Sequence, residues 1–150
     1  MSFRIHSPAF QNGGAIPERY ARDGANLSPP LQWADPPAGT KSLMLVMEDP
    51  DAPHGVFRHW GIHGINPQQT ELREGIGADG RRQAVNDFGR PGYDGPLPPR
   101  GHGAHHYHFK LLALDVANLD VPPGAHVGQT WDAARPHVLD EAELVGLFER

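Results

Sequence analysis

Short stretches of apolar residues recur along the chain and predict β-strands. Lys41–Met47 contains the continuous apolar run Leu43–Met47 and stops at two acidic residues, which is typical of a buried strand. His106–Asp115 has the strongest strand pattern. Val56–Ile65 is long enough for a helix, but its two internal glycines favour a strand. Two weaker strand patterns lie at Phe3–His6 and Leu31–Trp33.

The C-terminal residues predict a short helix. Asp140 is placed to cap it and Glu143 follows at the third helical position, as in a capping box. Leu144, Leu147 and Phe148 then share one helical face. Ten residues are below the ~12–15 that an isolated helix needs, so we expect this helix to dock on the body of the protein. Shorter helical segments are predicted at Thr130–Arg135 and around Thr70–Glu74.

The long connection Asn66–Gly103 has little apolar periodicity. Nine of the twenty residues from 86 to 105 are Gly or Pro. Connections of this length in a compact domain are usually functional or disordered. The aromatic residues Phe88 and Tyr93, together with the stiffening prolines, favour an ordered functional loop.

Composition excludes several classes of protein. With 18 Gly and 16 Pro in 150 residues, a helical bundle is disfavoured, whereas the apolar content is that of a folded single domain. The net charge of −5 and the absence of basic runs disfavour a nucleic-acid partner or an acidic membrane surface. Without Cys there is no disulfide and no thiolate nucleophile. The start has no apolar signal region and no apolar run could span a bilayer, so we expect a cytoplasmic protein with no integral membrane segment.

Two carboxylates follow the first buried strand, in the sequence Asp49-Pro50-Asp51-Ala52-Pro53. In one interpretation both side chains cap backbone N–H groups in a rigid turn. In the other, one carboxylate belongs to a site, because Glu48, Asp49 and Asp51 place three acids within four residues and repel one another unless something uses them.

Histidines gather in two clusters. In an extended strand, His59, Gly61 and His63 would share one face and Trp60 and Ile62 the other. In a helix, the two histidines of that face would lie four residues apart and could bind zinc together, a reading that the glycines weaken. The alternative is that they are ordinary, partly buried histidines.

The second cluster precedes and enters the strand at His106–Asp115. Alternation places His105 and Tyr107 on the face of the following apolar residues, at the mouth of an apolar layer where they need polar partners. His106 and His108 lie on the opposite face, either in solvent or at a partner surface. Adventitious metal binding is the alternative use of such a histidine-rich tract.

Four ordered motifs resemble those of the phosphatidylethanolamine-binding protein family, in its short bacterial and archaeal branch of Raf-kinase-inhibitor-like proteins. They are Asp49-Pro50-Asp51-Ala52-Pro53, His59-Trp60, Gly92-Tyr93 with Gly95-Pro96-Leu97-Pro98-Pro99-Arg100-Gly101, and His105-His106-Tyr107. Ser28–Trp33, Pro37–Leu43 and His137–Gly146 are similar to that branch as well, so the resemblance covers essentially the whole chain.

The resemblance implies a Greek-key β-sandwich of two packed sheets with an anion-accepting pocket at one end. It implies a pocket formed by Asp49, His59, His105 and Tyr107, with Pro99 and Gly101 in its wall and Asp51 beside it. We expect the imidazoles and the phenol to meet a phosphate or a phosphoethanolamine head group. Asp49 would either hold one histidine in a single tautomer or receive the ammonium of an ethanolamine head group. The prolines would stiffen the pocket rim, and the Ala52–Pro53 bond is a candidate for the cis form.

Two other functions stay open. An inhibitor of a serine protease or kinase would use an exposed loop, with Arg58 or the Asp94–Arg100 segment as candidates. A hydrolase or lyase would use His59 or His105 as a general base near Asp49, although no serine lies in a nucleophile elbow. His106 stands where the family commonly has Arg, and the short loop from Pro53 to His59 also departs from longer relatives, so their partner surfaces do not transfer. We expect no metal or cofactor, and a homodimer is compatible with the sequence.

Overall fold

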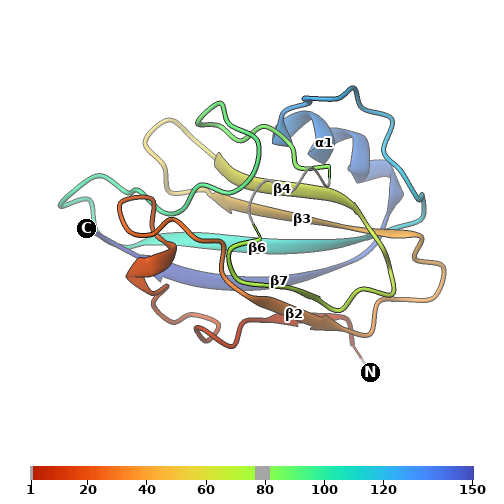
Figure 1. Cartoon of the computed structure of the whole chain (residues 1–150), viewed down its shortest axis with the longest axis horizontal. Helices are drawn as coiled ribbons and strands as arrows, with labels where there is room; N and C mark the ends of the chain where they lie inside the picture. The colour runs from red at the N-terminus through yellow and green to blue at the C-terminus, as the bar shows by residue number, and fades with distance from the viewer. Residues whose placement is uncertain (1, 77–81) are drawn as a thin grey trace.

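Two antiparallel sheets form the body of the protein in a computed structural model that describes residues 2–76 and 82–150 (Figure 1). The larger sheet has the strand order β4-β3-β6-β7, and the smaller has the order β1-β2-β5. The larger sheet contains β3 (Ser42–Asp49), β4 (Phe57–Ile65), β6 (His105–Leu114) and β7 (Val138–Phe148), and the smaller contains β1 (Arg4–His6), β2 (Leu31–Ala34) and β5 (Glu71–Leu72). The described residues add one α-helix, α1 (Val127–Ala134), and two 3₁₀ turns, η1 (Glu18–Tyr20) and η2 (Arg135–His137). The predicted mainly β architecture with two sheets is confirmed.

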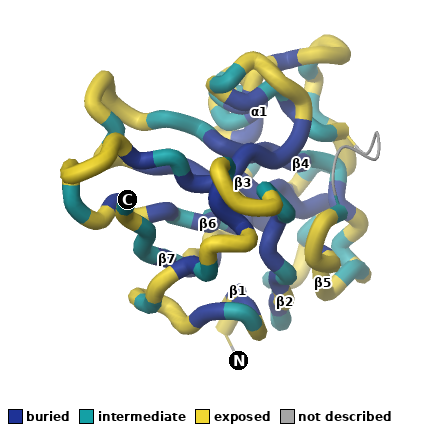
Figure 2. The backbone as a smooth tube through the Cα atoms, turned by 60° about the vertical axis from the view of Figure 1, so that its left-hand side comes forward, coloured by how far each residue is buried: buried dark blue, intermediate teal, exposed yellow. Residues whose placement is uncertain are grey.

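Strand β3 is the centre of the core, because all eight of its residues are buried. Its odd-numbered residues, among them Leu45 and Met47, join a cluster with Trp33 and Leu31 of the smaller sheet. Its even-numbered residues Met44 and Val46 pack on the other face against Val127 and Ala134 of α1. Figure 2 shows the buried middle of the large sheet between the small sheet and this helix. The continuous apolar run in the sequence thus reflects burial on both faces.

The alternation predicted for the second histidine cluster is confirmed. In β6, His105, Tyr107, Phe109 and Leu111 are buried, whereas His106 is exposed and His108 is partly exposed. The helix predicted at Thr130–Arg135 is also present, as α1.

The predicted C-terminal helix is wrong: Val138–Phe148 is strand β7, which pairs with β6 from His105↔Phe148 to Leu114↔Val138. The capping signal at Asp140 is local, whereas the ladder to β6 hydrogen-bonds the backbone of a long buried strand that would otherwise lack partners. A helix of about ten residues has little stability of its own, so the pairing with β6 determines the conformation of this segment.

Two further expectations need correction. The segment Thr70–Glu74 contains no helical turn; Glu71–Leu72 pairs with β2. The Ala52–Pro53 bond is trans. The loop from 86 to 105 lies against β4: Gln83, just before it, bridges Ile62, and the Asp94 N–H donates to the His59 carbonyl oxygen at 3.2 Å. Residues 77–81 of the long connection lie outside the described residues.

Candidate functional site

The candidate residues lie at one end of the large sheet, because antiparallel pairing brings the end of β3 beside the starts of β4 and β6. Asp49 pairs with Phe57, and Glu48 pairs with His108. Asp49, His59, His105 and Tyr107 consequently line one cavity of about 260 Å³. The sequence placed these residues on separate segments, and the strand pairing brings all four together.

A β-bulge turns His59 into this cavity. Met47 pairs with Trp60 and Glu48 with Arg58, so His59 has no opposite residue in β3. Bulges re-aim side chains in this way. The His59 ring contacts the Tyr107 ring, with 5.4 Å between centroids, on the same face as buried Trp60. The expected sharing of a face by His59, Gly61 and His63 is therefore wrong, because it assumed unbroken alternation.

Asp49 and His105 form a buried pair. Asp49 is 3% exposed and His105 is 2% exposed, and His105 Nδ1 lies 2.6 Å from Asp49 Oδ2. Because a carboxylate accepts, Nδ1 of His105 carries the proton and donates it. The other carboxylate oxygen, Oδ1, accepts the Asp51 N–H at 2.8 Å. Asp49 thus caps a turn and holds the proton of His105 on Nδ1.

His102 contacts the second nitrogen of His105. Its Nδ1 lies 2.6 Å from His105 Nε2, although His102 itself is exposed. When the His105 ring carries a proton on Nδ1 alone, Nε2 accepts and His102 donates. The result is a chain of hydrogen bonds from the surface through His102 and His105 to Asp49.

Tyr107 completes the polar floor of the cavity. Burial, and then the charge and hydrogen bond of Asp49, raise the pKa of the Tyr107 hydroxyl well above its ordinary value of 10. The hydroxyl therefore stays protonated at neutral pH and donates to Asp49, while the backbone N–H of Leu97 donates to it.

His59 is held from the opposite side by the backbone. Its Nδ1 lies 2.8 Å from the carbonyl oxygen of Asp94. Burial lowers the pKa of His59 below its ordinary value of 6.5, although the Asp94 carbonyl and the Asp49 charge partly oppose this shift. At neutral pH the ring is accordingly neutral, with its proton on Nδ1.

The cavity walls are mostly apolar. Phe57 and Phe88 stack edge-on at 4.7 Å between centroids, and both lie against the His59 ring. Other wall residues are Ala52, Pro53, His54, Gly55, Val56, Leu97, Pro98 and Pro99. The cavity thus combines a small polar floor with an apolar entrance.

Two expected site residues lie outside the cavity lining. Gly101 is exposed, in a left-handed conformation with φ of +73°. The Asp51 carboxylate turns outward to His106, accepting its backbone N–H at 2.8 Å and lying 2.8 Å from its Nδ1. The His106 backbone N–H is the main reason that the pKa of Asp51 is lowered. Asp51 therefore ties the loop after β3 to β6 through His106.

All three acids of the cluster have separate partners, which explains how the sequence tolerates them. Glu48 points to the α1 side, where Lys110 Nζ lies 2.7 Å and Arg58 Nε 3.5 Å from it. Asp49 has His105 and Asp51 has His106. Arg58 is thus ion-paired and only 26% exposed, which weighs against its insertion into a protease.

His63 lies away from this site and lines another cavity with Arg82. Within residues 2–76 and 82–150, no group of three or more His, Asp or Glu is arranged to hold a metal ion. His59 and His63 do not converge, so a zinc site that uses both is not formed.

Three residues with roles at this site were not predicted from the sequence: His102, Phe88 and Asp94. His102 lies in the Gly101-His102-Gly103 motif, and Phe88 and Asp94 lie in the Gly/Pro-rich loop. The loop composition indicated a functional segment, but nothing in it singled out these side chains.

Comparisons with known proteins identify the family and the fold. The family model described as phosphatidylethanolamine-binding protein matches residues 6–149. A UPF0098 protein of Aquifex aeolicus is 45% identical over 97% of this chain and 88% of its own length. "Putative lipoprotein LppC" of Mycobacterium tuberculosis is 44% identical over 97% of this chain and 71% of its own length. The crystal structure of E. coli YbcL, described as a new member of the mammalian PEBP family, superposes with a TM-score of 0.94 at 29% identity, covering 100% of this chain and 99% of that one.

One of these relatives carries a lipoprotein name, so the cytoplasmic location stays a prediction. No helix in the described part of the chain is long and apolar enough to cross a membrane.

Proposed function

Because the chain belongs to the phosphatidylethanolamine-binding protein family, we propose that the cavity of Asp49, His59, His105 and Tyr107 binds a small phosphate-bearing anion. The ligand is either free phosphate or the phosphate of a lipid head group such as phosphoethanolamine. The observation that carries the proposal is the convergence of two buried imidazoles, from β4 and β6, on one cavity with apolar walls.

The hydrogen-bond pattern indicates how an anion would be held. Tyr107 and Nδ1 of His105 both direct their protons to Asp49, and Nδ1 of His59 directs its proton to the Asp94 carbonyl. An imidazole that carries its proton on Nδ1 alone has an acceptor at Nε2. An anion therefore needs a proton on an imidazole, or on its own oxygen, to form a hydrogen bond there.

Charge balance leads to the same requirement. Among the described residues that line the cavity there is no Lys or Arg, and Asp49 contributes a negative charge. An anion bound beside a buried carboxylate is compensated if an imidazole takes up a proton. Affinity should therefore rise as the pH falls, with its midpoint below the ordinary histidine value of about 6.5, because burial lowers the pKa of His59.

Titration by NMR between pH 5.5 and 8 tests this proposal with two ligands, inorganic phosphate and phosphoethanolamine. We expect both to bind more tightly at low pH, and we expect His105→Ala to weaken both. His137→Ala is the control, because His137 is an exposed histidine that pairs with Asp115 at 2.9 Å away from the cavity. An affinity that ignores pH, or one that survives His105→Ala, would overturn the proposal. Binding of phosphoethanolamine alone would identify the head group as the ligand.

The inhibitor and hydrolase readings have less support from the site. The segment from Asp94 to Pro98 is mostly buried, leaving only Pro99 and Arg100 exposed at its end. The buried Asp49–His105 pair resembles a general base, but the nitrogen that would act already contacts His102.

A further inference from the structure

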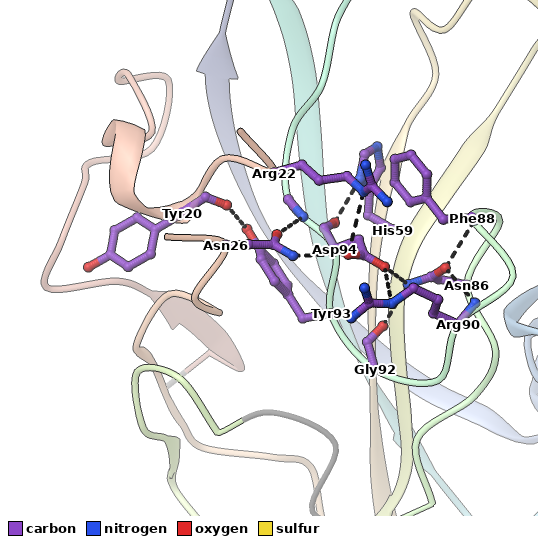
Figure 3. A network of polar contacts seen from close by, with 11 residues as sticks. Tyr20, Arg22, Asn26, His59, Asn86, Phe88, Arg90, Gly92, Tyr93 and Asp94 are labelled. Atoms are coloured by element: carbon purple, nitrogen blue, oxygen red, sulfur yellow. Dashed lines mark hydrogen bonds and ion pairs between the residues drawn. The ribbon is translucent and has the colours of Figure 1, made fainter. Parts of the chain in front are cut away.

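Asp94 is a fully buried carboxylate next to the cavity, yet it is not among the residues that line it. The side-chain amide nitrogens of Asn86 and Asn26 donate to its two oxygens at 2.8 and 3.0 Å. The Nε atoms of Arg90 and Arg22 lie 3.4 and 3.6 Å from the same oxygens. Figure 3 shows these four side chains converging on Asp94. A buried charge is costly unless it is paired and hydrogen-bonded in this way.

The backbone of Asp94 forms two hydrogen bonds with His59. Its N–H donates to the His59 carbonyl at 3.2 Å, and its carbonyl accepts from His59 Nδ1 at 2.8 Å. A carbonyl can only accept, so this contact requires the proton of His59 on Nδ1. Nε2 is thereby left as the ring nitrogen that can meet a ligand.

The partners of the Asp94 carboxylate also hold the loop that carries this carbonyl. The Asn86 side chain donates to the Gly92 carbonyl at 3.0 Å and accepts the Phe88 N–H at 2.9 Å. The Asn26 side chain accepts the Gly95 N–H at 2.7 Å. Gly92 and Gly95, which lie before and after Asp94 in the loop, are therefore tied to the side chains that bind its carboxylate.

The same network reaches the cavity wall. The guanidinium carbon of Arg22 lies 4.4 Å from the centre of the Phe88 ring, while Arg22 Nε points to Asp94. Phe88 in turn lies edge-on against His59, with 5.5 Å between ring centroids. The Asp94 carboxylate thus pairs with Arg22, Arg22 stacks on Phe88, and the Phe88 ring packs edge-on against the ring of His59.

We infer that Asp94 is a positioning residue for the anion cavity, which fixes His59 as the Nδ1–H tautomer and seats its ring against Phe88. This inference rests on the proposed function for its effect on affinity, but not for its effect on the tautomer. Asp94 acts through its backbone carbonyl and through Arg22, without touching the ligand.

Asp94→Asn tests the inference, because it keeps the size of the side chain and removes its charge. In the wild-type protein, long-range ¹H–¹⁵N spectra should show His59 protonated at Nδ1 only. In the variant, Arg22 and Arg90 lose their ionic partner, and the new side-chain amide nitrogen of residue 94 faces the amide donor of Asn86 or Asn26. We therefore expect a mixture of His59 tautomers. Phosphate affinity should fall about tenfold, the equivalent of one charge-assisted hydrogen bond. The His105 pattern should be unchanged, because His105 is held by Asp49.

Asp35→Asn is the matched control, since Asp35 pairs with Arg4 at 2.7 Å on the exposed surface. It should change neither readout. Arg22→Gln is a second variant, which keeps the amide bonds to Asp94 and removes the stacking on Phe88. It should lower phosphate affinity about threefold and produce the same change in the His59 signals. If Asp94→Asn does not fold, Arg22→Gln alone tests the positioning role of Asp94.

The two possible failures are distinguishable. If the wild-type protein binds phosphate and both variants keep a pure Nδ1–H tautomer and full affinity, the positioning role is overturned and the proposed function stands. If the wild-type protein binds neither phosphate nor phosphoethanolamine, the proposed function fails, while the tautomer spectra recorded without ligand still decide the role of Asp94.

Discussion

The Nδ1 atom of His102 lies 2.6 Å from the Nε2 atom of His105, so both ring nitrogens of His105 have partners within the protein. His102 is exposed, on the loop just before β6, whereas His105 is buried. An anion that approaches His105 Nε2 therefore competes with a side chain of the protein itself.

Replacement of His102 by Ala should strengthen anion binding. The ligand no longer has to displace a hydrogen bond worth about 1 kcal/mol, so phosphate affinity should rise roughly fivefold. An NMR titration at constant pH measures this, with His137→Ala as the exposed-histidine control. A weaker affinity in His102→Ala would instead mean that His102 contacts the ligand directly.

Asp49→Asn should destabilise the fold. The Tyr107 hydroxyl and His105 Nδ1 both donate to this carboxylate, and weakening two buried hydrogen bonds to a charged acceptor costs about 3 kcal/mol. Urea unfolding gives the change in the free energy of unfolding. Asp51→Asn is the matched control, because the exposed ion pair of Asp51 with His106 should contribute less than about 1 kcal/mol to the free energy of unfolding. Equal losses in the two variants would show that Asp49 is no more than a turn cap.

His59 should make the protein less stable in mild acid. Burial lowers its pKa in the folded state, so below about pH 6.5 the unfolded chain binds a proton that the folded chain does not. The free energy of unfolding should fall as the pH drops from about 6.5 towards the lowered pKa of the folded state, and should level off below it. Urea unfolding at pH 7.5 and 5.5 measures the loss, which should be smaller in His59→Gln. His63 also has a pKa lowered by burial, so some loss should persist in that variant. An unchanged acid loss in His59→Gln would contradict the assignment.

Gly95→Ala should disturb both stability and the site. A Cβ atom at this position would lie 1.9 Å from the Tyr20 carbonyl oxygen, which belongs to the backbone and cannot move aside easily. We expect a loss of about 2 kcal/mol or more and a change in the His59 signals, because the neighbouring Asp94 carbonyl must shift. In α1, Gly128→Ala meets only the end of the Arg58 side chain, at 3.6 Å, and should stabilise the protein by about 0.5–1 kcal/mol. Thermal unfolding that shows no difference between the two variants would refute this reading of Gly95.

The positions of three of the four strands of the large sheet, β3, β4 and β6, could be predicted from the sequence. Burial on both faces makes β3 a continuous apolar run, and burial on one face makes the start of β6 alternate between apolar and polar residues. Both patterns can be read from the local sequence. Alternation also placed His105 and Tyr107 together correctly. The resemblance to the family added that Asp49, His59, His105 and Tyr107 meet, which the strand pairing explains.

Other features depended on contacts between distant segments. Residues 138–148 carry a good helix-capping signal, but the ladder to β6 makes them a strand. His59 reaches the cavity only because a one-residue bulge against β3 breaks its alternation. Asp94 became identifiable only when Asn26, Arg22, Asn86 and Arg90 were seen to converge on its carboxylate (Figure 3).

The sequence by itself therefore determined three strands of the large sheet and which side chains were candidates for a site. The tertiary structure decided the register, the bulge and the tautomers. Burial leaves a local pattern along the chain, whereas register and hydrogen-bond partners depend on backbone groups far away in sequence, whose choice no local pattern records.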